Sequence, residues 1–435
     1  MSEKMYRSNI KTLIKWKLDK KRKPLVFLGA RQVGKTWLIE EFGKTEYRQL
    51  VYVNFDDKKA PKDMFLQNFD IKRLIIQLEL YANLKITPED TLIVFDEIQS
   101  APQGISSLKY FNENAPEYQI IAAGSLLGIN IHPGESFPVG KVDFLTLYPM
   151  SFYEFLLAMG ETGLARILDE KLWDYSPAFA EKFQEFLRYY FYVGGMPEAV
   201  LNFSQNRDWQ KVRKIQQNII TSYRNDFSKH TPKEILPRIN MIWDNIPAQL
   251  AKENKKFIYG VIKEGARAKD FELAIQWLTD TGLLHKVYSV TKPALPLVAY
   301  QYLSAFKLYH NDVGLLGAMS KLNPKTIING NAIFTEFKGA LTEQFVYQQL
   351  RLNENLSINY FPFSNNKYEI DFVIQNEDDE LVPIEVKAGE NLRAKSFKLF
   401  CEKFQPKTAI RTSLSDYRQE SWMTNVPLYL IGNYF

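Results

Sequence analysis

Short runs of apolar, β-prone residues recur through the first 150 residues, separated by longer helical or polar segments. These runs are PLVFL from residue 24, LVYVNF from 50, TLIVF from 91, YQIIAAG from 118 and VDFLTLY from 142. Continuous apolar runs without polar alternation are typical of strands buried on both faces, as in parallel sheets covered by helices. The pattern therefore predicts a doubly wound α/β domain, to which we assign residues 1–170.

The apolar spacing changes to three- and four-residue intervals after about residue 151. SFYEFLLAMG, FAEKFQEFLRYYFYV and WQKVRKIQQNIITSYRNDF each show this spacing, which predicts helices from about residue 151 onward. We assign residues 171–325 to a helical region. After Asn323-Pro324 a helix around EFKGALTEQFVYQQL is followed by the strand-like segments YEIDFVI and LVPIEVKA. We expect residues 326–435 to form a further α/β domain.

The composition limits the function classes without changing the predicted fold. The 435 residues are 46% hydrophobic and 24% charged, and the formal net charge of +5 permits a nucleic-acid partner without arguing for one. The single cysteine, Cys401, excludes an internal disulfide and a thiolate zinc cluster. No apolar run approaches the ~18 residues that span a bilayer, and residues 1–24 are too charged for a signal peptide. We therefore expect a cytoplasmic protein without a membrane partner.

Residues 27–42, FLGARQVGKTWLIEEF, match the phosphate-binding pattern G-x-x-x-x-G-K-[ST]. Glycines let the backbone wrap so that amide groups point at phosphate oxygens, and a following helix adds its positive end. Lys35 would reach the β- and γ-phosphates, and the Thr36 hydroxyl would bind Mg²⁺. A plain glycine turn before a helix is the alternative, but the position between a strand and a helix favours ATP binding. The predicted cofactor-binding residues are Gly29, Ala30, Arg31, Gln32, Val33, Gly34, Lys35, Thr36 and Trp37.

Two carboxylates follow the apolar run TLIVF. Because ligands in parallel sheets bind at the carboxyl ends of strands, Asp96 and Glu97 should emerge near the glycine loop. Asp96 would hold Mg²⁺, and Glu97 would orient and polarise the attacking water. Ser125, after the next apolar run, would contact the γ-phosphate or that water, or cap a helix. The alternative is that Asp96 and Glu97 are only solvated residues at the end of a strand. Their occurrence together with the phosphate-binding pattern favours the functional interpretation.

These segments together resemble the AAA-type ATPases of prokaryotes. GARQVGKT, VFDEIQ, AAGS and SFPVGKVDFLTLYPMSFYEF occur in this order, and YVGGMPEAV, FKLYHNDVGLLGAM, EIDFVI and IEVK extend the resemblance over nearly the whole chain. It implies a P-loop ATPase that uses ATP and Mg²⁺, in a family of which little is known beyond ATP binding. Lys141 departs from the arginine expected in the segment PVGRV, so no catalytic role is carried over to it.

The middle of the chain shows the element order of a winged helix-turn-helix at about residues 240–295. Two short helical segments, a turn, a longer amphipathic helix and the strand-like LLHKVYSV follow one another. Arg267, Lys269 and Gln276 would face DNA, but neighbouring acidic residues balance them. Direct DNA binding and a packing or protein-contact role both remain open.

A second group of carboxylates lies in the last hundred residues. Glu343 is on a predicted helix, Asp371 is in YEIDFVI, and Glu385 and Lys387 alternate on LVPIEVK and so share one face of a strand. This D…E-x-K arrangement resembles the restriction-endonuclease-like fold, in which such groups hold Mg²⁺ and activate water for phosphodiester cleavage. An exposed strand pair with a salt bridge, or a fold retained for binding alone, would give the same pattern.

We therefore expect an ATPase whose nucleotide cycle controls the helical and C-terminal domains. One alternative is a nucleotide-gated switch that binds DNA or a protein with little turnover, and another is an ATP-regulated nuclease. Arg7 and Arg31 are candidates for phosphate contacts. An oligomer is compatible with the sequence, which does not identify the partner.

Overall fold

The computed structural model describes residues 5–124, 137–252, 255–324, 335–364, 367–389 and 395–435. The chain forms two compact units: the P-loop unit, residues 7–148 with 280–282, and the larger unit, which holds residues 149–279 and 283–435 with the N-terminal end. None of the helices in the described segments has both the length and the apolar character needed to span a bilayer.

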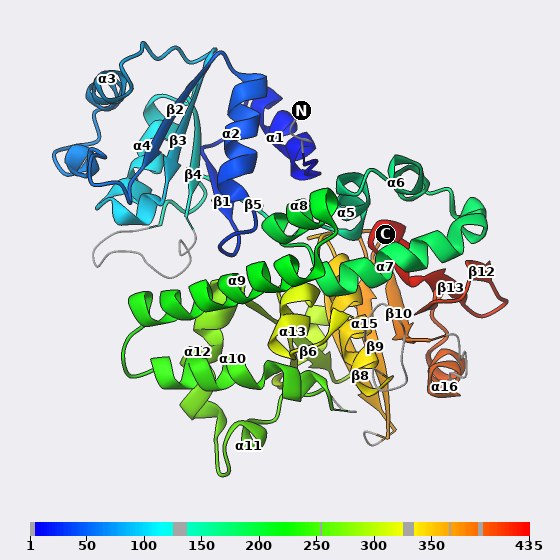
Figure 1. Ribbon diagram of the computed structural model, residues 1–435. Helices are drawn as coiled ribbons and strands as arrows, with labels where there is room; N and C mark the ends of the chain where they lie inside the picture. The colour runs from blue at the N-terminus through cyan, green and yellow to red at the C-terminus, as the bar shows by residue number, and fades with distance from the viewer. Residues whose placement is uncertain (1–4, 125–136, 253–254, 325–334, 365–366, 390–394) are drawn as a thin grey trace. The chain divides into compact units, whose positions relative to one another are not determined.

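The P-loop unit is built on a five-stranded parallel sheet with the order β2-β3-β4-β1-β5. All five apolar runs noted in the sequence form its strands, which confirms the predicted parallel sheet. Their side chains are mostly buried because helices cover both faces, α1 and α2 on one and α3 and α4 on the other (Figure 1). The strands are β1 (Leu25–Leu28), β2 (Gln49–Asn54), β3 (Thr91–Asp96), β4 (Gln119–Ala123) and β5 (Asp143–Thr146). The helices are α1 (Asn9–Leu18), α2 (Lys35–Glu46), α3 (Ile71–Ala82) and α4 (Gly104–Asn114), with short 3-10 turns at Lys62–Phe65 and Ile98–Ser100.

The helical part of the larger unit follows the predicted three- and four-residue spacing. Its helices are α5 (Phe152–Ala158), α6 (Thr162–Asp169), α7 (Ala180–Val193), α8 (Pro197–Asn206), α9 (Trp209–His230), α10 (Leu236–Leu250), α11 (Tyr259–Ile262), α12 (Ala268–Asp280) and α13 (Val313–Met319), with 3-10 turns at Trp173–Phe179 and Leu297–Tyr300. Aromatic side chains dominate its interior; Trp243, for example, is fully buried and packs edge-on against Tyr223 and Phe227.

An eight-stranded mixed sheet forms the other part of the larger unit, in the order β12-β13-β11-β10-β9-β8-β6-β7. Its strands are β6 (Leu284–Val290), β7 (Gln301–His310), β8 (Ser357–Phe363), β9 (Tyr368–Gln375), β10 (Leu381–Val386), β11 (Ile410–Ser413), β12 (Arg418–Gln419) and β13 (Thr424–Pro427). The helices of this part are α15 (Thr335–Leu350), α16 (Lys395–Phe404) and α17 (Ile431–Tyr434), with a 3-10 turn at Leu428–Leu430.

The sheet continues across the expected boundary between residues 325 and 326. β6 and β7 form an antiparallel hairpin from the middle region, and β6 pairs in parallel with β8 at Ser289 and Tyr360. Hydrogen bonding between strands that are distant in sequence thus joins the middle and C-terminal regions into one sheet.

Helix α15 lies at the centre of the larger unit, in contact with β7, β10, α13 and α17. Every side chain from Ala340 to Leu350 is buried, although several are polar. Gln344 donates to the His310 carbonyl at 2.6 Å, and Gln348 accepts from the Val313 amide at 2.8 Å. These bonds satisfy polar groups that would otherwise destabilise the buried helix.

Candidate functional site

The loop between β1 and α2 wraps through backbone conformations that favour glycine. Gly29 and Gly34 have φ angles of 134° and 95°, and Gln32 between them is also left-handed at 64°. A Cβ atom on Gly29 would lie 2.3 Å from the Leu147 carbonyl oxygen, so a side chain there would clash with fixed backbone. The loop therefore has the tight curvature that an amide cradle for phosphate needs.

Lys35 begins α2 and turns back over this loop. Its ammonium group donates to the carbonyl oxygens of Gly29 at 2.6 Å and Ala30 at 2.9 Å, and the residue is only 9% exposed. Burial lowers the pKa of Lys35 to about 8, although the negative charges of Glu97 and Asp96 act in the opposite direction. The lysine is thus held within the loop by backbone acceptors.

Asp96, the last residue of β3, lies next to the start of α2. Its Oδ2 is 3.4 Å from the Thr36 hydroxyl and also accepts from the Tyr52 phenol on the neighbouring strand β2. Burial and this hydrogen bond raise the pKa of Tyr52. Asp96 ends β3, whereas Thr36 follows β1, and strand β4 lies between these two strands in the sheet. The two predicted metal ligands are nevertheless in contact.

Glu97 follows Asp96 in a left-handed conformation, with φ of 48°. Its backbone amide donates to Asp96 Oδ1 at 3.0 Å, which tightens the turn after β3. The side-chain amide of Gln99 donates a hydrogen bond to Glu97 Oε2 and so fixes the orientation of the carboxylate. A non-glycine residue in this conformation is uncommon and often marks a functional site.

The other residues named from the sequence have different surroundings. Arg7 is buried and donates to the carbonyls of Val33 at 2.8 Å and Tyr148 at 2.6 Å. Its guanidinium group therefore stabilises the glycine loop through the Val33 backbone. Lys141 pairs with Glu113 at 2.9 Å. Ser125 lies outside the described residues, and its predicted role is untested.

The donor set around the glycine loop fits a nucleotide-bound magnesium ion. Mg²⁺ takes hard oxygen ligands, commonly a few protein groups together with phosphate oxygens and water. The exposed Thr36 hydroxyl and the Asp96 carboxylate supply such oxygens side by side. No cluster of three or more His, Cys, Asp or Glu side chains suited to a metal occurs in the described residues, so the protein groups alone do not form a metal cage.

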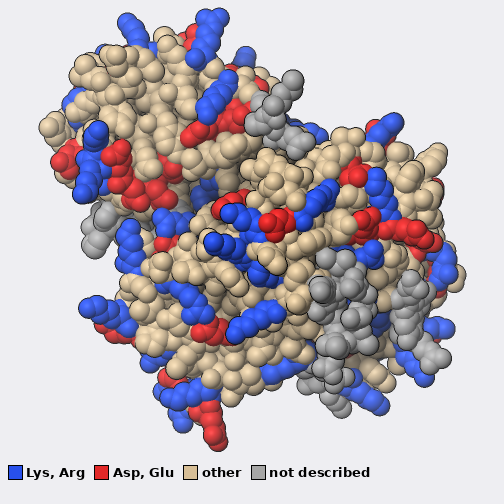
Figure 2. Space-filling view, viewed as in Figure 1, with Lys and Arg blue, Asp and Glu red and all other residues tan. Residues whose placement is uncertain are grey.

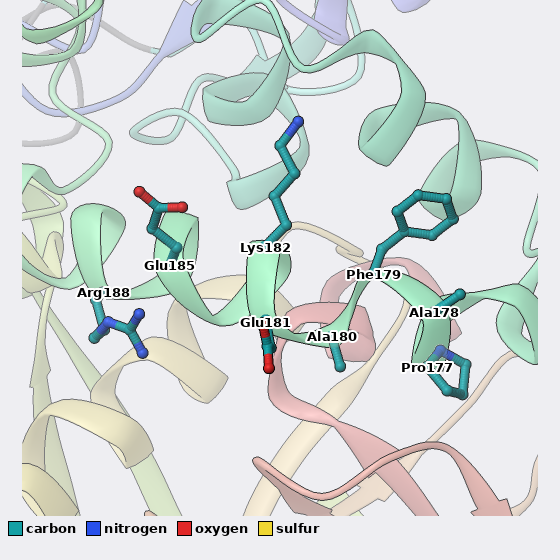
Figure 3. A pocket seen from close by; sticks show the side chains of 8 residues that line it. All are labelled: Pro177, Ala178, Phe179, Ala180, Glu181, Lys182, Glu185 and Arg188. Carbon is teal, nitrogen blue, oxygen red and sulfur yellow. The ribbon is translucent and has the colours of Figure 1, made fainter.

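A hollow on the larger unit runs along the start of α7 (Figure 3). Lys182 and Glu185 point to one side of the helix and Glu181 and Arg188 to the other, and Lys182 pairs with Glu161 at 2.5 Å. The polar side chains that line this hollow do not converge on one point, in contrast to the polar groups around the glycine loop.

The helix predicted to read DNA is α12, which the hairpin of β6 and β7 follows. It exposes Lys269 and Gln276, together with Asp270, Glu272 and an apolar Leu273 that is 68% exposed. Acidic and basic side chains are also interspersed over the face of the molecule shown in Figure 2. Neither the DNA-binding nor the protein-contact interpretation is favoured by this surface.

The C-terminal carboxylates are brought together by β9, β10 and α15. Asp371 accepts from the Val386 amide at 2.8 Å, and Glu385 pairs with Lys387 at 2.6 Å. Burial and the charges of Glu385 and Glu343 raise the pKa of Asp371 to about 8. The predicted grouping of these residues on neighbouring elements is therefore observed, while a nuclease function remains a hypothesis.

Three family models match successive parts of the chain. Residues 21–156 match an AAA domain, residues 184–326 match a domain of unknown function (DUF8612), and residues 338–431 match another (DUF4143). The first match agrees with the resemblance of the GARQVGKT and VFDEIQ segments. The comparisons thus support an AAA-type, nucleotide-binding P-loop domain in the first part of the chain.

Similar proteins extend over most of the chain but differ strongly in sequence. An uncharacterized protein of Methanocaldococcus jannaschii is 21% identical over 394 residues, which cover 86% of this chain and 77% of the relative. Among solved structures, a Walker-type ATPase of Pyrococcus abyssi has a TM-score of 0.45 and 12% identity, covering 73% of this chain and 96% of its own. The ORC1 protein of Aeropyrum pernix, solved in complex with DNA, has a TM-score of 0.27 and 13% identity, covering 72% and 90%.

Sequence reasoning missed several residues around both groups. Tyr52 and Gln99 contact the acidic pair after β3, while Lys255 and Lys307 contact Glu343. Of these residues, only Lys307 could have been recognised from the sequence, because a lysine inside the otherwise apolar strand AFKLY requires a buried partner. The other contacts depend on strand order and side-chain direction, which the sequence pattern does not specify.

Proposed function

We propose that the P-loop unit binds ATP with magnesium and hydrolyses it, and that Glu97 is the catalytic base. The observation that carries this proposal is the meeting of the glycine loop, Thr36 and Asp96 at the carboxyl ends of the parallel strands, with a Thr36–Asp96 distance of 3.4 Å. The match of residues 21–156 to an AAA domain supports the same nucleotide class.

Binding would require Lys35 to exchange its partners. Its ammonium group donates hydrogen bonds to the Gly29 and Ala30 carbonyls, and the triphosphate would take the place of these weaker acceptors. Thr36 and Asp96 would hold the accompanying Mg²⁺, which supplies positive charge against the phosphate oxygens. The exchange couples the arrival of ATP to a rearrangement of the loop.

Glu97 would accept the proton of a water molecule directed at the γ-phosphate. Gln99 holds the carboxylate by donating to its Oε2, and the Glu97 backbone amide, which donates a hydrogen bond to Asp96 Oδ1, fixes the backbone beneath it. Holding a base in one orientation reduces the reorganisation needed for proton transfer. Gln99 is therefore a positioning residue in this proposal.

Two variants test the proposal. Lys35→Ala should abolish ATP binding, whereas Glu97→Gln should bind ATP and lose hydrolysis by about 10²- to 10⁴-fold. Nucleotide affinity by calorimetry and phosphate release measure the two effects separately, and Glu89→Gln, an exposed carboxylate, is the control for charge. Equal turnover in the wild-type protein and Glu97→Gln would refute the assignment of the base.

Turnover also separates an ATPase from a nucleotide-gated switch. A switch awaiting a DNA or protein partner would hydrolyse far more slowly than the ~1–10³ s⁻¹ common among enzymes. Phosphate release should therefore be measured alone and with single- and double-stranded DNA. Stimulation by DNA would identify the partner class, and tight binding with unchanged, very slow release would favour the switch.

A further inference from the structure

The net positive charge of the protein is concentrated in residues 11–23, which we call the basic segment. Seven of these thirteen residues are lysine or arginine, and one, Asp19, is acidic. The whole chain has 55 basic and 50 acidic residues, so the residues outside the basic segment have 48 basic and 49 acidic side chains, a net charge of −1. Basic residues gathered along one helix are typical of surfaces that bind nucleic acid.

Helix α1 buries one face and presents lysines on the other. Leu13 and Trp16 are buried, and α1 packs against α2 (Figure 1). Lys11 and Lys15 are about one helical turn apart, on the side opposite these two buried residues, and both are exposed. The face of α1 that is free to meet a partner is therefore basic.

Other cations of the basic segment attach it to the rest of the P-loop unit. Arg22 donates to the Glu117 carbonyl oxygen at 3.2 Å, and Lys17 pairs with Glu46 at 3.3 Å. These contacts hold the segment in place, so a partner would bind a surface that is already ordered. Binding to such a surface avoids the entropic cost of ordering a flexible tail.

Four lysines of the basic segment point into solvent. Lys20 and Lys21 lie in the turn after α1 and are exposed, as Lys11 and Lys15 are. Among the residues that the structure describes, none forms a hydrogen bond or an ion pair with the ammonium groups of these four lysines. Phosphate groups can therefore approach them without displacing a carboxylate, and the counterions released from the nucleic acid favour binding.

The chemistry of this surface favours a nucleic-acid duplex over a membrane or a single strand. A helix that lies in a membrane interface inserts a broad apolar face, whereas the apolar face of α1 is buried against its own unit and only Leu18, at 73% exposure, accompanies the lysines. Single strands are typically bound by exposed aromatic rings that stack on the bases, but Trp16 is buried. A duplex presents a dense row of phosphates, which suits exposed ammonium groups.

We propose that the basic segment binds the phosphate backbone of a nucleic-acid duplex through Lys11, Lys15, Lys20 and Lys21. Lysine contacts phosphate as a flexible point charge, so binding is independent of the base sequence. The surface belongs to the unit that holds the glycine loop and is distinct from α12, the helix considered above for DNA contact. The proposal does not depend on ATP hydrolysis.

Fluorescence anisotropy of a labelled DNA duplex of roughly 30 base pairs, with the full-length, nucleotide-free protein, tests the proposal. The test variant combines Lys11→Gln, Lys15→Gln, Lys20→Gln and Lys21→Gln. At about 100 mM NaCl its affinity should be at least about tenfold lower than that of the parent, and the slope of log K against log[NaCl] should be shallower by about 3. The control variant loses the same charge at four exposed lysines elsewhere on the P-loop unit and should stay within about threefold of the parent; it combines Lys58→Gln, Lys59→Gln, Lys72→Gln and Lys85→Gln.

Equal losses of affinity in the test and control variants would overturn the proposal, as would a parent protein that does not bind the duplex. Arginine at the four test positions keeps the charge and should retain binding, so loss of binding in that variant also counts against the proposal. Vesicles containing phosphatidylserine and polyglutamate serve as competitors at equal charge. Displacement of the duplex by either competitor as effectively as by unlabelled duplex would show that the surface serves a membrane or an acidic protein.

A second measurement decides if the test variant does not fold, as judged by circular dichroism. Acetylation of individual lysines in the parent, followed by mass spectrometry, reports which ammonium groups the duplex covers. The duplex should slow acetylation of the four test lysines severalfold and leave the four control lysines unchanged. Equal slowing of both sets, or of neither, would overturn the proposal.

Discussion

At the scale of single residues, Lys35 shows how burial and backbone acceptors set the protonation of the glycine loop's lysine. The ammonium group is buried among backbone carbonyls, and its lowered pKa of about 8 reflects the cost of that burial. A triphosphate would stabilise the charged form much more strongly than carbonyl dipoles do. Nucleotide binding and the protonation of Lys35 should therefore be linked.

This linkage predicts a pH dependence of ATP affinity. Because the protonated lysine binds phosphate, the dissociation constant should be constant below the pKa of about 8 and rise above it. The limiting slope is about tenfold per pH unit. Titration with a non-hydrolysable ATP analogue across this range measures it. Lys35→Arg is the control, since a guanidinium stays charged and should remove the dependence; the same slope in both proteins would contradict the assignment.

Gln99 gives a second prediction at the residue scale. Gln99→Leu removes the donor that holds Glu97 Oε2 while preserving side-chain size. We expect the rate of hydrolysis to fall about tenfold with the KM for ATP unchanged, because the base loses its orientation but the phosphate contacts remain. Steady-state kinetics separate the two parameters. A change in KM alone would show that Gln99 acts on binding.

At the scale of elements, the turn between α7 and α8 ties together segments that are far apart in sequence. The Gly195 amide donates to the buried Asp312 at 2.6 Å, and its carbonyl accepts from Met150 at 2.7 Å. A Cβ on Gly195 would lie 2.2 Å from the Met150 carbonyl oxygen. The glycines of YVGGMPEAV are thus required for close backbone approach.

Gly195→Ala should consequently destabilise the larger unit. Backbone has to move to admit the methyl group, which we expect to cost roughly 2–4 kcal/mol of unfolding free energy. Chemical denaturation measures this cost. Gly163→Ala in α6 meets no atom within 4 Å and should be neutral or slightly stabilising. Equal stability of Gly195→Ala and the wild type would show that the turn adapts.

At the scale of the whole molecule, the carboxylate cluster is shared between the middle and C-terminal regions. Lys255 and Lys307 come from the segment before residue 325, while Glu343, Asp371 and Glu385 follow it. The sheet is shared in the same way, because β6 pairs with β8. The two regions therefore depend on each other for both hydrogen bonds and charge balance.

Fragments test this dependence. A fragment of residues 326–435 should fail to fold, since Glu343 would lose both lysines, and removing a partner from a buried ion pair typically costs about 3–5 kcal/mol. A fragment of residues 149–435 retains both regions and should unfold cooperatively. Circular dichroism during heating compares them. Cooperative unfolding of the shorter fragment would show that the C-terminal region is an independent domain.

The sequence by itself determined the parallel sheet of the P-loop unit and the location of its candidate site. Five apolar runs gave the strands, and the spacing of Gly29, Gly34 and Lys35 located the loop, because burial on both faces and tight backbone curvature are local requirements. Strand endings likewise identified Asp96 and Glu97.

Only the tertiary structure decided which side chains surround these residues. Tyr52 reaches Asp96 because β2 lies beside β3, and Lys255 and Lys307 reach Glu343 because β7 and the segment after α10 pack against α15. Such contacts depend on strand order and on pairing between segments up to 88 residues apart. Local periodicity carries no information about them, since it reports which face of an element is buried and not what covers that face.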